Sequence, residues 1–307
     1  MRIGIMMAEA GASNVADVAQ NVADLESDGF DAVWFGQIFG VDALTVIALA
    51  GQRTSRIGLG TAVVPTYPRH PFVMAQQALT VQSACGGRFT LGVGLSHHPV
   101  VEGTWGLSYE RPARHMREYL SVLRPLLQEG KVAFSGALFR TNGGVQVPGA
   151  KPTPVLIAAL APTMLKIAGT LADGTITWMT GVKTIESHIV PSLTAATKAA
   201  GRSGPRVVVG LPIAVTDDAD AARERAARTF VVYGQLPNYR RVLDREGVEG
   251  PKDVVIVGDE KACERQLREL ASAGATDLCA AMFPAGDDAR ASLARTREFL
   301  KGMVGKV

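Results

Sequence analysis

Short apolar runs alternate with amphipathic stretches along almost the whole chain. Runs of four to seven mostly apolar residues predict buried strands at 3–7, 32–35, 57–63, 89–94, 155–159, 174–178, 207–210 and 276–281. Between them, apolar residues recur at helical spacing, and Ser13-Asn14 and Asp42 stand where helix caps are expected. Further helices are predicted over 72–84, 110–129, 185–200 and 219–232, with another centred on Leu165 to Leu171.

Eight strands, each followed by a helix, predict a closed parallel (β/α)8 TIM barrel, with an open doubly wound sheet as the alternative. The chain is much longer after the fourth and seventh strands, which predicts insertions over about 95–153 and 216–275. The first contains the helix at 110–129 and a predicted hairpin at 131–140. The second contains a polar stretch at 235–252, an extra strand at 254–257 and a helix at 259–273. We find no linker, so one domain over 1–307 is expected.

The composition narrows the classes of partner. With 47% hydrophobic and 20% charged residues, the chain can bury a full core. The net charge of +3 is spread along the sequence, so nucleic acid is not an expected partner, and no apolar run has the ~18–20 residues of a membrane helix. Cys85, Cys263 and Cys279 have no paired spacing, which favours a reducing compartment and a cytoplasmic protein.

In a barrel, functional groups gather just after the strands, at their carboxyl ends. After the fifth strand, residues 158–164 are mostly small and place Pro162 in the first turn of a helix, where free N–H groups suit a phosphate. An ordinary strand-to-helix joint explains this spacing equally well. Gly58, Gly60, Gly92 and Gly94 similarly indicate either tight barrel packing or backbone cleared for a flat ligand. The other strand-end candidates are Glu9, Gln37, Val63, Thr66, Tyr67, His70, Ser96, His97, His98 and residues 178–180.

Other site chemistries find little support. The neighbours His97 and His98 would point to opposite sides of an extended chain, and no third ligand has matching spacing, so no metal is expected. His115 and Glu118 lie three apart on a predicted helix and are expected to face solvent. Ser96 lacks a GxSxG elbow, which disfavours a hydrolase.

Five segments, in order along the chain, resemble the bacterial luciferase-like superfamily, and specifically its deazaflavin (coenzyme F420)-dependent oxidoreductases. They are 29–35 (GFDAVWF), 57–64 (IGLGTAVV), 69–71 (RHP), 87–94 (GRFTLGVG) and 172–175 (ADGT). The resemblance implies a tricyclic cofactor over the strand ends, resting on a bulge after the third strand that contains a non-proline cis peptide, here Ala62-Val63. It also implies that Gly94 to His97 flank the ribityl chain and ring edge. The implied cofactor contacts are Gln37, Ala62, Val63, Gly94, Ser96, Ala158, Ala159, Leu160, Ala161, Pro162, Thr163 and Met164, the last six carrying the phosphate.

One departure from the family bears on the reaction. Sugar-phosphate and alcohol dehydrogenases of this family have an acidic residue and a histidine after the second strand, where this chain has Gln37-Ile38. Neither can take a hydroxyl proton, so His97 is the proton-carrier candidate, with a role as cofactor contact as the alternative.

The resemblance therefore implies an F420-dependent oxidoreductase, most simply a reductase that passes hydride to a small hydrophobic substrate. Alternatives are an FMN-dependent monooxygenase and a non-catalytic flavin- or deazaflavin-binding protein. A phosphate isomerase or aldolase barrel would need a lysine or glutamate base at a strand end, and Lys166 and Lys183 both fall on predicted helices. Because relatives are commonly dimers, a homodimer is expected.

Overall fold

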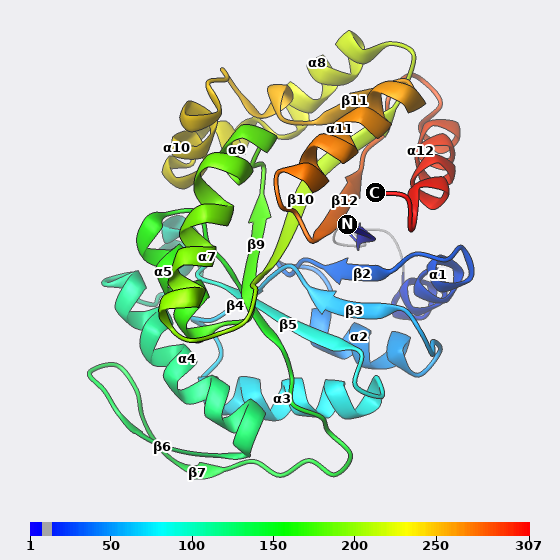
Figure 1. Cartoon of the computed structure of the whole chain (residues 1–307). Helices are drawn as coiled ribbons and strands as arrows, with labels where there is room; N and C mark the ends of the chain where they lie inside the picture. The colour runs from blue at the N-terminus through cyan, green and yellow to red at the C-terminus, as the bar shows by residue number, and fades with distance from the viewer. Residues whose placement is uncertain (8–13) are drawn as a thin grey trace.

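The computed structural model describes residues 1–7 and 14–307, and these form a closed parallel barrel surrounded by helices (Figure 1). Glu9 and Ser13 lie outside the described residues. The fold class predicted from the sequence is confirmed, because β9 pairs with β10, β10 with β12 and β12 with β1, which closes the cylinder. The strands are β1 (Arg2–Met7), β2 (Ala32–Phe35), β3 (Gly58–Thr61), β4 (Val64–Pro65), β5 (Phe89–Gly94), β6 (Lys131–Ser135), β7 (Arg140–Gly144), β8 (Val155–Ala158), β9 (Gly174–Trp178), β10 (Arg206–Val215), β11 (Ile256–Gly258) and β12 (Asp277–Met282).

The helices alternate with the barrel strands. They are α1 (Val15–Ser27), α2 (Ala43–Gly51), α3 (Pro71–Ala84), α4 (Pro112–Glu129), α5 (Pro162–Leu171), α6 (Val182–Thr184), α7 (Val190–Ala199), α8 (Ala219–Thr229), α9 (Val231–Gln235), α10 (Pro237–Glu246), α11 (Glu260–Ser272) and α12 (Ala289–Met303). Two π-helical turns, η1 (Pro99–Thr104) and η2 (Ile185–Ile189), and a 3-10 turn, η3 (Pro251–Asp253), complete them. None of the described helices is long and apolar enough to cross a membrane.

Polar side chains at helix starts explain several boundaries. Asn14 accepts a hydrogen bond from the backbone N–H of Asp17, and Asp42 accepts one from that of Thr45. His70 begins α3, its Nδ1 accepting from the N–H of Phe72 at 3.2 Å, so its role is that of a cap. Each cap satisfies an N–H that would otherwise lack an intrahelical partner.

The third barrel strand is broken in its middle. β3 ends at Thr61, and the chain rejoins the sheet as β4, so β3 and β4 both pair with β5. At the break, Thr61 Oγ1 accepts from the N–H of Gly92 and donates to its carbonyl, both at 2.8 Å, in place of the missing ladder bonds. A Cβ at Gly92 would lie 2.0 Å from the Thr61 carbonyl oxygen. This glycine therefore serves the packing of the broken strand.

Side chains fill the barrel axis. The indole of Trp34 is 1% exposed, and a Cβ at Gly60 would lie 2.4 Å from it and one at Gly4 2.8 Å from it. At the amino ends of the strands, Asp277 binds the guanidinium of Arg206 at 2.6 Å, and that guanidinium also lies 5.0 Å from the centre of the Trp34 ring. Trp34 therefore belongs to the core, and this end of the cylinder is closed.

The two long connections follow β5 and β10, as predicted. After β5 come η1, then α4, which packs against α3 and α5 in the ring of helices, and then the hairpin β6–β7. After β10, the polar stretch contains α10, a helix that the sequence pattern did not reveal, and β11 then pairs with the last three residues of β10. In Figure 1, α8, α9, α10 and β11 lie together at the upper end, beyond the arrowhead of β9.

Candidate active site

Three strand ends meet at the carboxyl face of the barrel. Val63 lies between β3 and β4, while Gly94 and Ala158 are the last residues of β5 and β8. A Cβ on Gly94 would come within 2.6 Å of Val63 Cγ2 and 3.4 Å of Ala158 Cβ. The small residues therefore let three neighbouring strands approach closely, and Val63 and Ala158 remain half-buried. The structure thus brings together three of the residues expected to bind the cofactor.

The peptide bond between Ala62 and Val63 is cis, as the resemblance implied. The N–H of Ala62 donates to the carbonyl of Phe35 on the neighbouring strand at 2.7 Å. Ala62, Val63 and Met6 are partly buried on top of the apolar cluster that contains Trp34. These residues cover the inner core and form the surface of the barrel mouth at the third strand.

The segment 159–164 joins β8 to α5. Ala161 begins α5 without a side-chain cap, Pro162 is its first residue, and its first turn carries no acidic residue. The early N–H groups, such as those of Thr163 and Met164, have no intrahelical acceptor because of their position. The carbonyl of Ala159 accepts from Thr175 Oγ1 at 3.3 Å, and that of Leu160 lies 2.9 Å from His188 Nε2. The loop carbonyls are thus fixed by neighbouring elements at the positive end of α5.

His97 follows β5 and lies half-buried, with its ring centre 6.0 Å from that of Tyr239. Burial lowers the pKa of His97 below its ordinary value of 6.5, because desolvation disfavours the charged imidazolium. The ring is therefore mostly neutral at pH 7. The next residue, His98, is exposed and pairs with Glu102 at 3.1 Å, so the two histidines face different partners.

Ser96 and Gln37 lie outside the small-residue group of Val63, Gly94 and Ala158, and each has its own backbone contact. Ser96 has a φ of 60°, in the left-handed region, and its carbonyl accepts from the hydroxyl of Tyr109 at 3.3 Å. Gln37 follows β2, and its Oε1 accepts from the N–H of Ala43 at 3.2 Å, so it helps to begin α2. Among the described residues, no hydrogen bond joins Gln37 to Val63, Gly94 or Ala158.

The expectation that His115 faces solvent is wrong. Its ring is 7% exposed, stacks on Tyr67 with 4.0 Å between ring centres, and lies 3.0 Å from Thr66 Oγ1. Burial lowers its pKa to about 4, and Glu118 opposes that shift only in part. Glu118 accepts from backbone N–H groups in the turn of the hairpin β6–β7. The helical spacing was correct, but the hairpin covers this face of α4.

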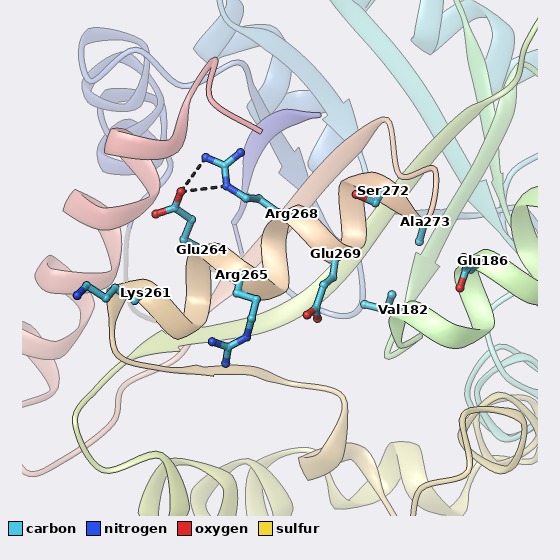
Figure 2. A pocket seen from close by; sticks show the side chains of 9 residues that line it. All are labelled: Val182, Glu186, Lys261, Glu264, Arg265, Arg268, Glu269, Ser272 and Ala273. Atoms are coloured by element: carbon cyan, nitrogen blue, oxygen red, sulfur yellow. Dashed lines mark hydrogen bonds and ion pairs between the residues drawn. The ribbon is translucent and has the colours of Figure 1, made fainter.

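Two surface hollows lie away from the barrel mouth. The larger encloses about 540 Å³ between α11 and the turn formed by α6 and η2 (Figure 2). Along it run Lys261, Arg265 and Glu269, while Arg268 pairs with Glu264 at 2.7 Å. The smaller, of about 330 Å³, lies beside α9, α10 and η3. Neither hollow is lined by a residue of a barrel strand, so both are distinct from the strand-end group of Val63, Gly94 and Ala158.

Comparison with known proteins now identifies the family. The profile of the luciferase-like monooxygenase family matches residues 1–277. The chain belongs to this family. Membership confirms the resemblance seen in the sequence and supports the expectation of an oxidoreductase.

Proteins similar to this luciferase-like chain are described with two kinds of cofactor. An F420-dependent glucose-6-phosphate dehydrogenase of Nakamurella multipartita is 31% identical over 270 residues, covering 83% of this chain and 77% of that one. The coenzyme F420-dependent tetrahydromethanopterin reductase of Methanopyrus kandleri has the same fold, with a TM-score of 0.79, 23% identity and coverage of 100% and 98%. The oxygenating constituent of 3,6-diketocamphane monooxygenase of Pseudomonas putida, solved with FMN, gives a TM-score of 0.75 at 15% identity, with coverage of 100% and 98%.

Some residues of the site were not found by sequence reasoning. Thr61, Thr175 and His188 fix the backbone around the strand ends, but each acts through a contact with a segment distant in sequence. Tyr239 reaches His97 from the helix that the polar pattern concealed. Only the three-dimensional pairing of the second insertion with the barrel reveals it.

Proposed function

We propose that this luciferase-like protein is a coenzyme F420-dependent oxidoreductase, working as a reductase on a small, hydrophobic organic substrate. The observation that carries the proposal is the juxtaposition of the small-residue group Val63, Gly94 and Ala158 with the uncapped start of α5. The family relatives that use F420 favour this cofactor over FMN.

The residues present fit a flat ring with an anionic tail. Small side chains at the ends of three adjacent strands offer a low surface, and Ala62 and Val63 cover the apolar core beneath it. Thr163 and Met164 would hold a phosphate through their free N–H groups, and the first turn of α5 has no carboxylate to repel it. Ala158, Ala159, Leu160, Ala161 and Pro162 would shape this end of the site.

The protein would orient the substrate and move one proton. A bound deazaflavin supplies a hydride to an electron-poor carbon. When that carbon gains hydride, the adjacent atom must gain a proton, and His97 is the group at the mouth that can carry it. Its lowered pKa makes the protonated form a minor species but a stronger acid at neutral pH. The Gln37 amide cannot accept a hydroxyl proton, which disfavours oxidation of an alcohol.

The test is a titration of the purified protein with oxidised and reduced F420 and with FMN, followed by cofactor fluorescence and absorbance. We expect F420 to bind and its reduced form to be oxidised by an enone or another activated alkene. Tight FMN binding without a response to F420 would instead support the monooxygenase, since the phosphate site suits both cofactors. Binding of F420 without turnover of enones, imines or activated alkenes would support a non-catalytic binding protein.

The assembly state is a separate proposal. We infer a homodimer because members of this family are commonly dimers. Light scattering coupled to size-exclusion chromatography measures the mass of the assembly directly. A monomer at micromolar concentration would refute it without affecting the proposed chemistry.

A further inference from the structure

Aromatic rings form a continuous chain across the barrel mouth. From His97 the ring contacts run to Tyr239 at 6.0 Å between centres, on to Tyr233 at 5.1 Å and then to Trp178 at 5.8 Å. From Trp178 they continue to Phe230 at 6.2 Å and to Phe283 at 5.9 Å. We call these six residues the aromatic arc.

The arc lies at the carboxyl ends of the strands. Trp178 is the last residue of β9, Phe283 directly follows β12, and His97 follows β5 by three residues. Because all barrel strands are parallel, these three positions share one face of the cylinder. Phe230, Tyr233 and Tyr239 belong to the second insertion and reach the same face through their ring contacts. The arc therefore spans the half of the mouth from the fourth to the eighth barrel strand.

The arc differs from the two most deeply buried rings of the other ring cluster, Tyr119 and His115. In that cluster Tyr119 is fully buried and donates to the carbonyl of Arg69, and His115 is held by Thr66. In the arc every ring except Phe283 is only half-buried. Phe283 and Phe230 pack in the apolar cluster of α8 and β11, and Trp178, Tyr233 and Tyr239 pack against the main core. The arc therefore offers a ligand only the part of its rings that stays exposed.

The chemistry of the arc limits what it can bind. Its members are uncharged aromatic rings together with a histidine that is mostly neutral at pH 7. The nearby guanidinium of Arg240 is engaged by Asp244 and by the carbonyls of Val248 and Glu249. Aromatic faces and edges favour flat, conjugated partners over aliphatic ones of similar size.

We infer that the aromatic arc is the substrate-recognition wall and that it selects an uncharged, planar, aryl-conjugated substrate. This inference rests on the proposed function, since it assigns the substrate class of the same site. Tyr233, Tyr239 and Trp178 are specificity-determining residues, and His97 at the end of the arc meets the part of the substrate that needs a proton.

The test compares two enones with the same reacting group, 4-phenyl-3-buten-2-one and 3-penten-2-one. Calorimetry measures their binding to protein loaded with oxidised F420, which cannot reduce them, so binding is read without turnover. We expect Tyr239→Leu and Tyr233→Leu each to weaken binding of the aryl enone by about threefold to tenfold and to leave the aliphatic enone within twofold. Tyr239→Phe and Tyr233→Phe should bind as the wild type does. Phe299→Leu, a half-buried ring on α12 outside the arc, serves as the control.

The outcomes separate the two proposals. Equal weakening of both enones, or no weakening of either, overturns the role of the arc even when F420 binds. If F420 does not bind, the proposed function fails on the cofactor titration. The same calorimetric comparison is then made with FMN-loaded or cofactor-free protein, where loss of aryl preference in the leucine variants still supports the arc and its retention overturns it.

Discussion

The buried histidine His188 provides a direct test of how the anion loop is held. Its ring is 8% exposed, and Nε2 lies 2.9 Å from the carbonyl oxygen of Leu160, 28 residues earlier in the chain. Because a carbonyl can only accept, Nε2 must carry the proton in this bond. His188 therefore acts as a positioning residue, since it touches the loop and not the proposed ligand.

Replacing His188 with alanine leaves a half-buried carbonyl without its donor, which costs about 1–2 kcal/mol if the loop does not rearrange. If the loop is held in its anion-binding form at this cost, affinity for a phosphate-bearing ligand falls about fivefold to thirtyfold. The assay is fluorescence titration with F420 and with the same ring and ribityl chain lacking the phosphate tail. We expect His188→Ala to weaken the first and spare the second, and His188→Gln, which retains a donor, to restore most of the difference.

The comparison of ligands makes the result decisive. A purely structural loss would weaken both ligands together and lower the melting temperature in proportion. Equal losses for both ligands, or unchanged affinity for F420 in a folded His188→Ala protein, would show that Leu160 is not held for the sake of an anion.

Three further predictions concern charge. Thr163→Glu places a carboxylate in the first turn of α5, where it favours the helix but repels a phosphate. Thermal stability should therefore hold or rise, while F420 affinity should fall at least tenfold. The neutral Thr163→Gln should bind F420 normally, and equal F420 affinity of the two variants would remove α5 from the site. His97→Gln should lower kcat more than it lowers substrate affinity. In the wild type, protonation of His97 should change kcat below pH 6.5, because the pKa of His97 is lowered. If the variant loses affinity as much as it loses kcat, His97 is a contact only. Burial opposes ionisation of Asp277, but hydrogen bonds and charge from Arg206, with Thr276 and Arg2, hold its pKa below the ordinary 3.8. The stabilisation by Asp277 is therefore complete above pH 3.8 and lost as the pH falls through the lower native pKa. Asp277→Asn should lower the free energy of unfolding at pH 7 by about 2–4 kcal/mol, measured by urea unfolding, and should lose less stability in acid than the wild type. If the variant loses stability with falling pH as steeply as the wild type, this reasoning is contradicted.

The strand pattern was predictable because the barrel strands are buried on both faces. The predicted runs at 32–35, 89–94 and 174–178 match β2, β5 and β9 without a shift at either end. The third strand was predicted as continuous over 57–63 from its apolar residues, but the chain leaves the ladder after Thr61. The pattern of apolar residues indicates which residues are buried, but not which backbone groups form ladder bonds. Ala62 and Val63 are apolar whether or not their N–H groups pair with a neighbouring strand.

The site was predictable only where one segment carries it. Residues 158–164 form the end of β8 and the start of α5, so their relation follows from local sequence. The contacts of Leu160 with His188 and of His97 with Tyr239 join segments far apart in the chain. The second insertion was the least predictable part, because α10 is amphipathic over a largely polar stretch and buries only Val242 and Leu243 in its interior-facing turn.

The ten residues of β10 link the closed end of the cylinder to the second insertion. Arg206 at its start is fixed by Asp277, and Ile213 to Val215 at its far end are paired with β11. The segment between Thr216 and Val255 is therefore attached at both ends to the same strand, β10. A redesign of this segment must therefore keep two attachments: its pairing with β10, and the hydrogen bonds that Glu246 accepts from the N–H groups of Lys183 and Thr184.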